Sequence, residues 1–341
     1  MKQIWITRKG PPEVLQVKEG PDLVPGPNQV LLSVKAAGVN FSDLLARRGR
    51  YPEAPNPPMV VGYEVSGEVL GLGQGVTEFS LGQKVFAPVY FGGYSSQCLV
   101  SKEQVFPIPA GMSFSQAAAF PINYLTAFAV AHEIGRIRTG DRVLIYSAAG
   151  GVGLALIDLC RVCGAVPVGV ASASKHSALK KRGVETLIDS KSATLDEDIL
   201  KASQPKGFDL IFDSRGGESW SSSLKLLAPF GKLIAFGFSS CLDEITTGVP
   251  AFKPEGTHIW FGADLFQLAQ SNVSVAGFNL ATLWKKSFSE IRKWTLELLK
   301  YQEQGKLNIT VDKEFRFEEA AEAHRYLEDR KNFGKVVLLP S

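Results

Sequence analysis

The pattern of hydrophobic and polar positions changes near residue 123 and divides the chain in two. Before that point, short runs alternate between apolar and polar side chains, at 3–7, 14–18, 29–35, 60–70, 83–89 and 94–100. Turns rich in glycine and proline, such as Pro25-Gly26-Pro27, separate the runs. Frequent short strands with this punctuation are typical of antiparallel barrels. We therefore predict a barrel-like β-domain over residues 1–122.

Beyond residue 123, apolar strand-like runs alternate with helical patterns. The predicted strands cover 143–146, 166–170, 186–188, 208–212, 232–236 and 273–276, and helices are predicted at 153–163, 175–182 and 219–227. Six strands separated by crossovers predict a doubly wound parallel sheet, and hence an α/β fold, over residues 123–280.

The C-terminal stretch returns to the first domain in our interpretation. An amphipathic helix is predicted at 289–304, with Ile291, Trp294, Leu298 and Tyr301 on one face and Gly305 as its stop. A helix at 318–329 and an apolar strand at 336–339 follow. The first domain is then discontinuous, made of residues 1–122 and 281–341.

Charge and composition exclude some function classes. The 341 residues include 37 basic and 34 acidic side chains, a balance that argues against nucleic acid or an anionic membrane as the main partner. No apolar run approaches the ~20 residues of a membrane span, and the N-terminus has no signal-peptide pattern. We expect a cytoplasmic protein. Cys160 and Cys163 form a C-x-x-C, but they lie inside a predicted helix and are expected to pack as small hydrophobic residues.

The segment 142–153, RVLIYSAAGGVG, predicts a phosphate-binding turn between the first strand of the second domain and its helix. Backbone N–H groups and the helix dipole favour an anion there, and small residues let a pyrophosphate approach. Gly150 and Gly153 occupy the second and third positions of G-x-G-x-x-G, whereas Ala148 stands at the first. The position after the first strand strengthens this otherwise weak motif.

The end of the second strand favours NADP(H) over NAD. An NAD-binding fold places a carboxylate there for the ribose 2′-hydroxyl. This chain has Ser172, Ser174 and Lys175 instead, two hydroxyls and an ammonium that suit a 2′-phosphate. The alternative is a polar turn with a solvated lysine.

Six stretches resemble the zinc-free quinone oxidoreductase, or zeta-crystallin, group of the medium-chain dehydrogenase/reductase superfamily. They are AAGVNFSDLLARRGRYP (36–52), VVGYEVSGEVLGLGQGV (60–76), NYLTA (123–127), AAGGVG (148–153), GKLIAFG (231–237) and NFGKVVL (332–338). Within that group, ASASKH (171–176) and VAGFNL (275–280) look most like the branch of the vesicle amine transport protein 1 homologues, which are associated with synaptic vesicles and the mitochondrial surface. The resemblance implies a GroES-like barrel and a Rossmann domain, with the cofactor in the cleft between them, and a homodimer.

The resemblance also implies the cofactor contacts, by position in the motifs. Asn40 faces the nicotinamide from the barrel, and Thr126 lies beneath it. The remaining contacts are the pyrophosphate turn (Ala149, Gly150, Gly151 and Val152), the 2′-phosphate site (Ser172, Ser174 and Lys175), the end of the fifth strand (Gly237 and Phe238) and the C-terminal loop (Asn332 and Lys335).

The same comparison predicts chemistry without a metal. Zinc-dependent relatives use a cysteine and a His-Glu pair from the barrel, where this chain has Asn40 and Gly62-Tyr63-Glu64. Hydride transfer to a quinone or an α,β-unsaturated carbonyl needs no Lewis acid, because the acceptor delocalises the incoming charge. Asn40 is predicted to polarise an oxygen, and Tyr51 and Tyr63 to donate a hydrogen bond or stack on a flat ring; a structural role for either tyrosine stays open.

Two function classes remain from the sequence. The first is an NADPH-dependent reductase of quinones or enones. The second is a cofactor-binding scaffold with an interaction or lipid-handling role, for which the segment 252–269, with Trp260, Phe261, Leu265 and Phe266, is the candidate surface. The alternative for these side chains is the lining of a substrate pocket or a dimer contact. Arg47, Arg48 and Arg50 are expected to form a solvated helix end, with attraction of an anionic acceptor as the alternative.

Overall fold

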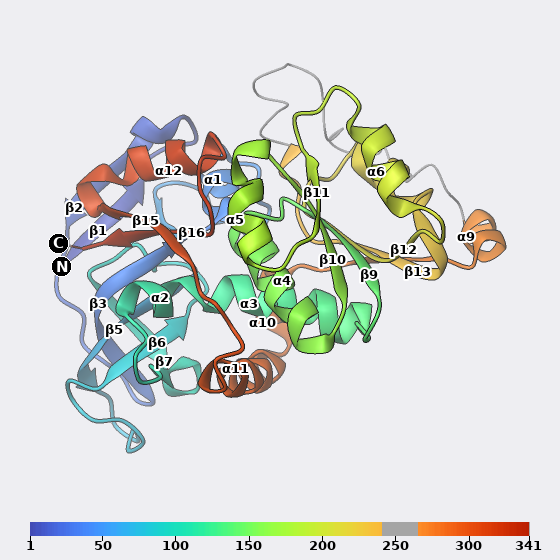
Figure 1. Ribbon diagram of the computed structural model, residues 1–341. Coiled ribbons are helices and arrows are strands. Elements are labelled where there is room, and N and C mark those ends of the chain that lie inside the picture. The colour runs from blue at the N-terminus through green and yellow to red at the C-terminus, as the bar shows by residue number, and fades with distance from the viewer. Residues whose placement is uncertain (241–264, 341) are drawn as a thin grey trace. The chain divides into compact units, whose positions relative to one another are not determined.

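A computed structural model describes residues 1–240 and 265–340 of the chain. The chain divides into two compact units, Met1–Leu125 with Leu280–Ser341, and Thr126–Asn279. These bounds lie within a few residues of the predicted domain boundaries, and the C-terminal stretch belongs to the first unit (Figure 1).

The first unit is built on two β-sheets. A smaller sheet has the strand order β2-β1-β4, and a larger one has the order β15-β16-β3-β5-β6-β8, with β7 paired to β3. The strands are β1 (Lys2–Ile6), β2 (Leu15–Glu19), β3 (Gln29–Val39), β4 (Met59–Val60), β5 (Glu64–Leu72), β6 (Lys84–Pro88), β7 (Gln97–Ser101), β8 (Phe106–Pro107), β15 (Val311–Arg316) and β16 (Lys335–Leu339). All pairs are antiparallel except β15 with β16.

The structure corrects one predicted strand in this unit. The run 60–70 is divided into β4 and β5 by a turn at Gly62, whose φ is +99°. A side chain at Gly62 would place its Cβ 2.6 Å from the Tyr94 ring, so both the backbone conformation and the lack of space require glycine. This turn positions Tyr63 and Glu64, the two residues that follow it.

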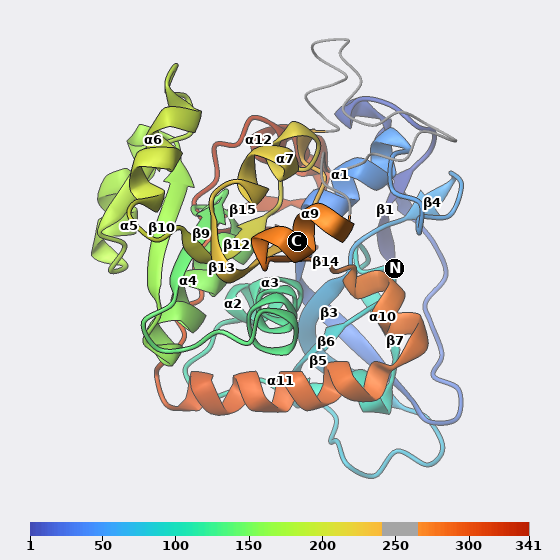
Figure 2. The ribbon, with the colours of Figure 1, turned by 90° about the vertical axis from the view of Figure 1, so that its right-hand side faces the viewer.

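Helices complete the first unit. They are η1 (Pro12–Val14), α1 (Phe41–Arg48), η2 (Lys102–Gln104), α2 (Phe114–Ala119), α10 (Leu280–Lys286), α11 (Phe288–Glu303), η5 (Phe317–Glu319) and α12 (Ala320–Glu328), and α3 (Pro121–Phe128) crosses into the second unit. The amphipathic prediction for α11, the long helix at the bottom of Figure 2, is confirmed, since Ile291, Trp294 and Leu298 are buried. Gly305 follows with φ +67°, as expected of a helix stop.

The second unit is a doubly wound parallel sheet. Its strand order is β11-β10-β9-β12-β13-β14, which is the order 3-2-1-4-5-6 of the dinucleotide-binding fold. The strands are β9 (Arg142–Tyr146), β10 (Val166–Ala171), β11 (Thr186–Asp189), β12 (Phe208–Asp213), β13 (Leu227–Ala235) and β14 (Ser274–Gly277). The helical segments are η3 (Ala129–Gly135), α4 (Gly151–Cys163), η4 (Ala173–Lys175), α5 (His176–Lys181), α6 (Leu195–Ser203), α7 (Glu218–Leu224) and α9 (Leu265–Ser271).

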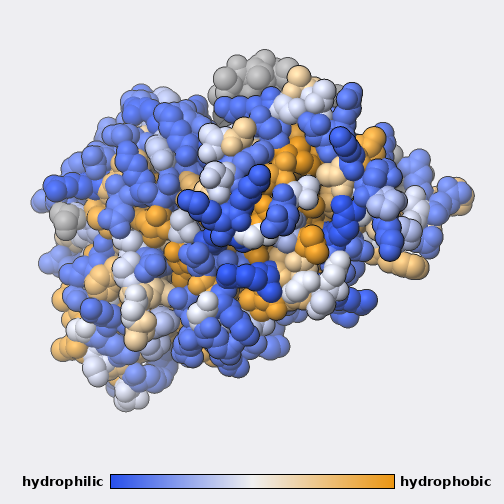
Figure 3. Space-filling view, in the orientation of Figure 1, coloured by the Kyte–Doolittle hydropathy of each residue, from blue (hydrophilic) through white to orange (hydrophobic). Residues whose placement is uncertain are grey.

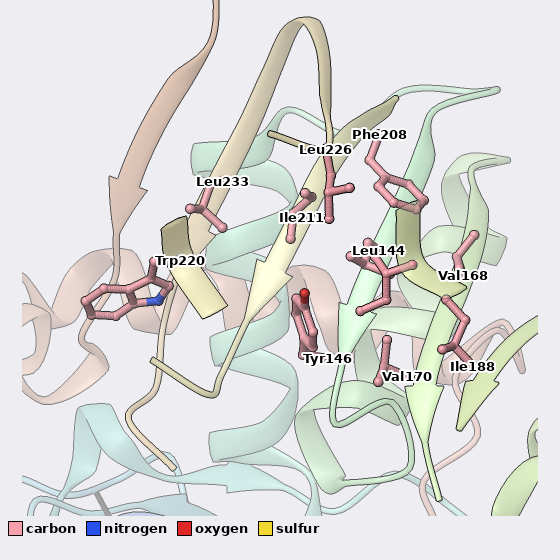
Figure 4. Packing of buried hydrophobic residues seen from close by; sticks show 11 residues of the cluster. Leu144, Tyr146, Val168, Val170, Ile188, Phe208, Ile211, Trp220, Leu226 and Leu233 are labelled. Atoms are coloured by element: carbon pink, nitrogen blue, oxygen red, sulfur yellow. The ribbon is translucent and has the colours of Figure 1, made fainter. Parts of the chain in front are cut away.

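One face of this sheet packs against α6 and α7. Alternate strand residues such as Leu144, Tyr146 and Ile211 meet Ile199 of α6 and Trp220 of α7 in one buried cluster (Figure 4). Helix α4 packs against β9 and β10, and Figure 1 shows it on the opposite face of the sheet from α6. With helices on both faces, the central residues of these strands, such as those at 143–146 and 210–212, are buried and apolar on both sides, which explains the continuous hydrophobic runs.

The surface viewed in Figure 3 carries mostly hydrophilic residues, with smaller apolar areas between them. Among the helices that the structure describes, none has the length and apolar character needed to cross a membrane.

Candidate functional site

The glycine-rich turn of the second unit lies between β9 and α4, as predicted. Gly150 is the N-cap of α4, and the first-turn amides of Gly151, Val152 and Gly153 have no acceptor within the helix. A Cβ on Gly153 would lie 2.7 Å from the backbone of Ala148, so only glycine lets the helix start this close to the turn. The geometry is that of an anion cradle at a helix N-terminus.

Ala148 fits the turn for a structural reason. The left-handed conformation is adopted by Ser147 (φ +54°), whereas Ala148 has no positive φ. The Ala148 methyl is buried against β10, where a Cβ added at Gly169 would come within 3.1 Å of it. Glycine is therefore not needed at the first position of the motif in this chain.

The segment after β10 forms a short polar turn. Ser172 and Ser174 place their hydroxyl oxygens 3.4 Å apart, and η4 follows directly with Lys175 as its last residue. The carboxylate of Asp189, at the end of β11, lies nearby and accepts the backbone N–H groups of Ala173 and Lys191, each at 3.1 Å. Asp189 was not considered in the sequence analysis; the structure shows that this acid is engaged by backbone amides.

The carboxyl ends of β12 and β13 meet beside the turn. Ser214 donates to the hydroxyl of Ser147 at 3.0 Å, and Ser239 N–H donates to the carbonyl of Ser214 at 3.1 Å. Gly237 lies against this contact, since its Cβ would be 2.8 Å from the Ser214 carbonyl, and Phe238 is half-exposed. Ser147 and Ser214 lie at the same edge of the sheet as the predicted residues. No periodic pattern in the sequence identifies them. Thr126 is the first residue of the unit and lies buried in α3.

In the first unit, Asn40 and Lys335 meet in a buried polar cluster. Lys335 Nζ donates to Asn40 Oδ1 at 2.6 Å and forms an ion pair with Glu64. Asn40 Nδ2 donates to Glu64 Oε1 at 2.9 Å, and the N–H of Ile122 donates to Glu64 Oε2 at 2.8 Å. The Lys335 and Glu64 side chains are 3% and 0% exposed, so the pair is almost fully withdrawn from water.

A second buried acid lies beside this cluster. Asp43 accepts the backbone N–H of Asn40 at 2.8 Å and that of Gly62 at 3.1 Å, and it accepts the Tyr94 hydroxyl at 3.0 Å. The Tyr94 oxygen is 3.2 Å from Nε2 of His324 on α12. Burial raises the pKa of Asp43 to about 7, and the bonds that it accepts from Asn40 and Tyr94 oppose that shift. Burial also holds the pKa of His324 well below its usual value, so the imidazole is neutral.

Asn40 and Lys335 are predicted from the sequence, whereas Asp43, Tyr94 and His324 are not. A local signal existed for Asp43, because it stands three residues after Asn40, where a capping-box acid belongs. Tyr94 and His324 reach the cluster from distant parts of the chain, and no local pattern identifies them.

Tyr51 and Tyr63 lie together in an aromatic group of the first unit. Their ring centroids are 6.1 Å apart, and Tyr63 is 5.0 Å from Phe91, which in turn contacts Tyr90 at 4.8 Å. Burial raises the pKa of both Tyr51 and Tyr63 well above the usual tyrosine value, so both phenols stay protonated.

The expectation for the arginines is wrong for Arg47. Its side chain is fully buried, forms an ion pair with Glu328 of α12 and donates to the Gly10 carbonyl at 3.0 Å. Arg48, 25% exposed, shares Glu328 at 3.2 Å. The first of the three is therefore a structural cation rather than a solvated one. In the C-terminal loop, the buried side chain of Asn332 donates to the Gly334 carbonyl at 2.7 Å.

Comparisons with known proteins agree with this geometry. The family model "Alcohol dehydrogenase GroES-like domain" matches residues 26–129, and "Zinc-binding dehydrogenase" matches residues 182–338. The rat "Synaptic vesicle membrane protein VAT-1 homolog" is 37% identical, over 96% of this chain and 80% of its own length. The chain belongs to the medium-chain dehydrogenase/reductase superfamily.

Two further relatives are quinone oxidoreductases. That of Pseudomonas aeruginosa is 30% identical, over 99% of each chain. The Escherichia coli quinone oxidoreductase, solved in complex with NADPH, is 28% identical with a TM-score of 0.86 and full coverage of both chains. The predicted fold of a GroES-like antiparallel barrel domain and a Rossmann domain is confirmed, and the family assignment makes the chain an oxidoreductase of the quinone oxidoreductase type.

The name of one family model implies zinc, but the residues at the corresponding place do not fit that metal. Asn40 offers an amide, Tyr63 a protonated phenol, and Glu64 is already engaged by Lys335, Asn40 and Ile122 N–H. A zinc site needs several N, S or carboxylate ligands. Within residues 1–240 and 265–340, no group of three or more His, Cys, Asp and Glu side chains is placed to hold a metal ion.

Proposed function

We propose that the protein uses NADPH to reduce quinones or α,β-unsaturated carbonyls, with no metal in the reaction. The observation that carries the proposal is the buried Asn40–Lys335–Glu64 cluster, in which a lysine ammonium lies beside an amide donor. An ammonium beside a hydrogen-bond donor suits a reaction that places negative charge on an acceptor oxygen.

The turn before α4 supports binding of the NADPH pyrophosphate through backbone amides. Ser172, Ser174 and Lys175 supply two hydroxyls and a cation for the 2′-phosphate, and the competing acid, Asp189, is engaged by two backbone N–H groups. When bound, NADPH supplies the hydride.

The residues of the first unit act on the acceptor. Asn40 uses one of its two Nδ2 hydrogens for Glu64 and has the second for an acceptor oxygen. Lys335, held at Asn40 Oδ1, polarises that amide. Tyr51 and Tyr63 supply flat faces and protonated hydroxyls, which favours a planar conjugated acceptor.

A second candidate function is a cofactor-binding scaffold that docks a partner or lipid and turns over slowly. It is favoured by two exposed apolar side chains on α9, Leu265 (82% exposed) and Phe266 (68% exposed), and by the relatives that are named as synaptic vesicle membrane proteins. Trp260 and Phe261 of the same predicted surface lie outside the described residues. The homodimer and the cytoplasmic location stay predictions.

One assay separates the two functions. The protein is mixed with NADPH and a panel of quinones and enones, and the loss of nicotinamide absorbance is followed. We expect saturable turnover, with kcat/KM higher for NADPH than for NADH. Tight NADPH binding without turnover on any acceptor would favour the scaffold.

A pair of lysine variants tests the cofactor choice. Lys175→Ala is expected to raise KM for NADPH by about 10- to 100-fold, the value of a lost charge-assisted hydrogen bond, and to leave NADH kinetics unchanged. Lys191→Ala, an exposed lysine after β11, serves as the control and is expected to change neither. Equal kcat/KM for NADH and NADPH in the wild type, or an unchanged KM in Lys175→Ala, would rule out the 2′-phosphate site.

A further inference from the structure

Asn40 is held from two sides by groups that have no solvent access. Its amide bridges Lys335 and Glu64, while its backbone N–H is bound by Asp43. The Asp43 carboxylate is 0% exposed and also binds the N–H of Gly62, two residues before Glu64. The Asp43 carboxylate therefore holds the backbone at Asn40 and, through Gly62, close to Glu64, which are the two partners of the Asn40–Glu64 hydrogen bond.

Tyr94 and His324 continue this arrangement to α12. When Asp43 is ionised, its carboxylate only accepts, so the Tyr94 hydroxyl donates its hydrogen to Asp43 and its oxygen accepts from Nε2–H of His324. This direction fixes the His324 tautomer and leaves Nδ1 as a buried nitrogen with no hydrogen-bond partner among the described residues. Burying an imidazole with one unpaired nitrogen lowers the stability of the fold. Stability therefore does not explain this histidine, which points to a role for the bond at Nε2.

The three side chains connect the two segments that carry the proposed site. Asp43 lies in the first turn of α1, for which Asn40 is the N-cap, and His324 lies in α12, which precedes β16 with Lys335 at its start. Tyr94 lies between them, with its ring against Gly62. We propose that the Asp43–Tyr94–His324 chain is a positioning device that fixes the Asn40 amide for reaction, so that these residues act on catalysis through Asn40. This inference rests on the proposed function, in which Asn40 contacts the acceptor.

Tyr94→Phe removes one hydroxyl and keeps the ring that packs on Gly62. We expect kcat to fall about 10-fold, because a misplaced group loses near-attack geometry, and the Kd for NADPH, measured by nicotinamide fluorescence, to stay within about twofold. Hydrogen exchange of segment 38–44 is expected to become faster. Tyr326→Phe, on α12, is the matched control: it also removes a tyrosine–aspartate bond, at 2.9 Å to Asp312, but at the surface, and should change none of these quantities.

Two variants of His324 keep the test decisive if Tyr94→Phe does not fold, and a double variant extends it if Tyr94→Phe does fold. His324→Gln retains a neutral N–H donor and is expected to keep most of kcat, whereas His324→Leu should lose about as much as Tyr94→Phe. Asp43→Asn combined with Tyr94→Phe should lose no more kcat than the more impaired single variant, because both act on Asn40 through one chain.

The outcomes separate this inference from the proposed function. If the wild type binds NADPH and reduces no acceptor, the proposed function fails, and the exchange rate of segment 38–44 alone decides whether the chain holds Asn40. If the wild type is active and Tyr94→Phe keeps kcat within twofold, or if exchange of segment 38–44 is unchanged, the positioning role is overturned while the proposed function stands.

Discussion

At the scale of single residues, burial decides what each polar group does. Lys335, Glu64 and Asp43 are all at most 3% exposed, and each is engaged by two or three hydrogen bonds or ion pairs. Buried charges are tolerated in proteins only when they are paired in this way. The residue types at 40, 43, 64 and 335 thus depend on one another, and a change at one alters the requirement at the others.

Asp43 should make stability depend on pH. Its pKa of about 7 in the folded protein lies above the usual aspartate value, so the folded state binds this proton more tightly than the unfolded state does. The groups that face it are Tyr94, Tyr63, Tyr51 and Lys335. The free energy of unfolding of the wild type, minus that of Asp43→Asn, should fall as pH rises from about 4 to about 7, by at most about 1.4 kcal/mol per pH unit. Urea unfolding of both proteins between pH 4 and 8 measures this difference, and a flat difference would contradict the prediction.

At the scale of elements, α1 and α12 are joined by side chains of opposite charge and unequal burial. Arg47 and Arg48 both bind Glu328, yet Arg47 is fully buried and Arg48 is 25% exposed. The two arginines hold the last turn of α1 against α12, and the contact from Asp43 through Tyr94 to His324 holds its first turn. The two arginines provide a natural comparison, since their partner is the same.

Arg47→Met should destabilise the protein far more than Arg48→Met. The first leaves the Gly10 carbonyl without its donor and removes a buried cation, and we expect a loss of about 3 kcal/mol. The second removes a partly solvated ion pair, with an expected loss below about 1 kcal/mol. Chemical denaturation of the two variants measures both values; equal losses would show that burial of Arg47 carries no energetic weight.

At the scale of the whole molecule, the predicted cofactor residues fall in both compact units. The anion cradle and the Ser172–Lys175 turn belong to the second unit, and the Asn40–Lys335 cluster belongs to the first. Each unit has its own sheets and its own core, so each of these groups of residues is positioned by the fold of its own unit.

NADPH should stabilise the folded chain by mass action. At about 100 times its Kd, a ligand that binds only the folded state adds about 2.7 kcal/mol to the free energy of unfolding. The same concentration of NADPH should add clearly less to Lys175→Ala, because that variant is expected to bind more weakly. Thermal and urea unfolding with and without NADPH test this, and an unchanged midpoint in the wild type would argue against a nucleotide site.

Local patterns along the chain are sufficient to predict the two-part fold and the place of the anion turn. Hydrophobic runs with glycine and proline turns predicted the strand-rich first unit, alternating strands and helices predicted the parallel sheet, and Gly150 and Gly153 located the anion turn, because these signals are local in the chain. Three features appear only in the folded chain: the burial of Arg47, the bond from Lys335 to Asn40, and the path from His324 through Tyr94 to Asp43. Those partners lie tens to hundreds of residues apart, so a local pattern in the sequence does not show that they meet. They come into contact because β16 pairs with β3 and α12 packs against α1.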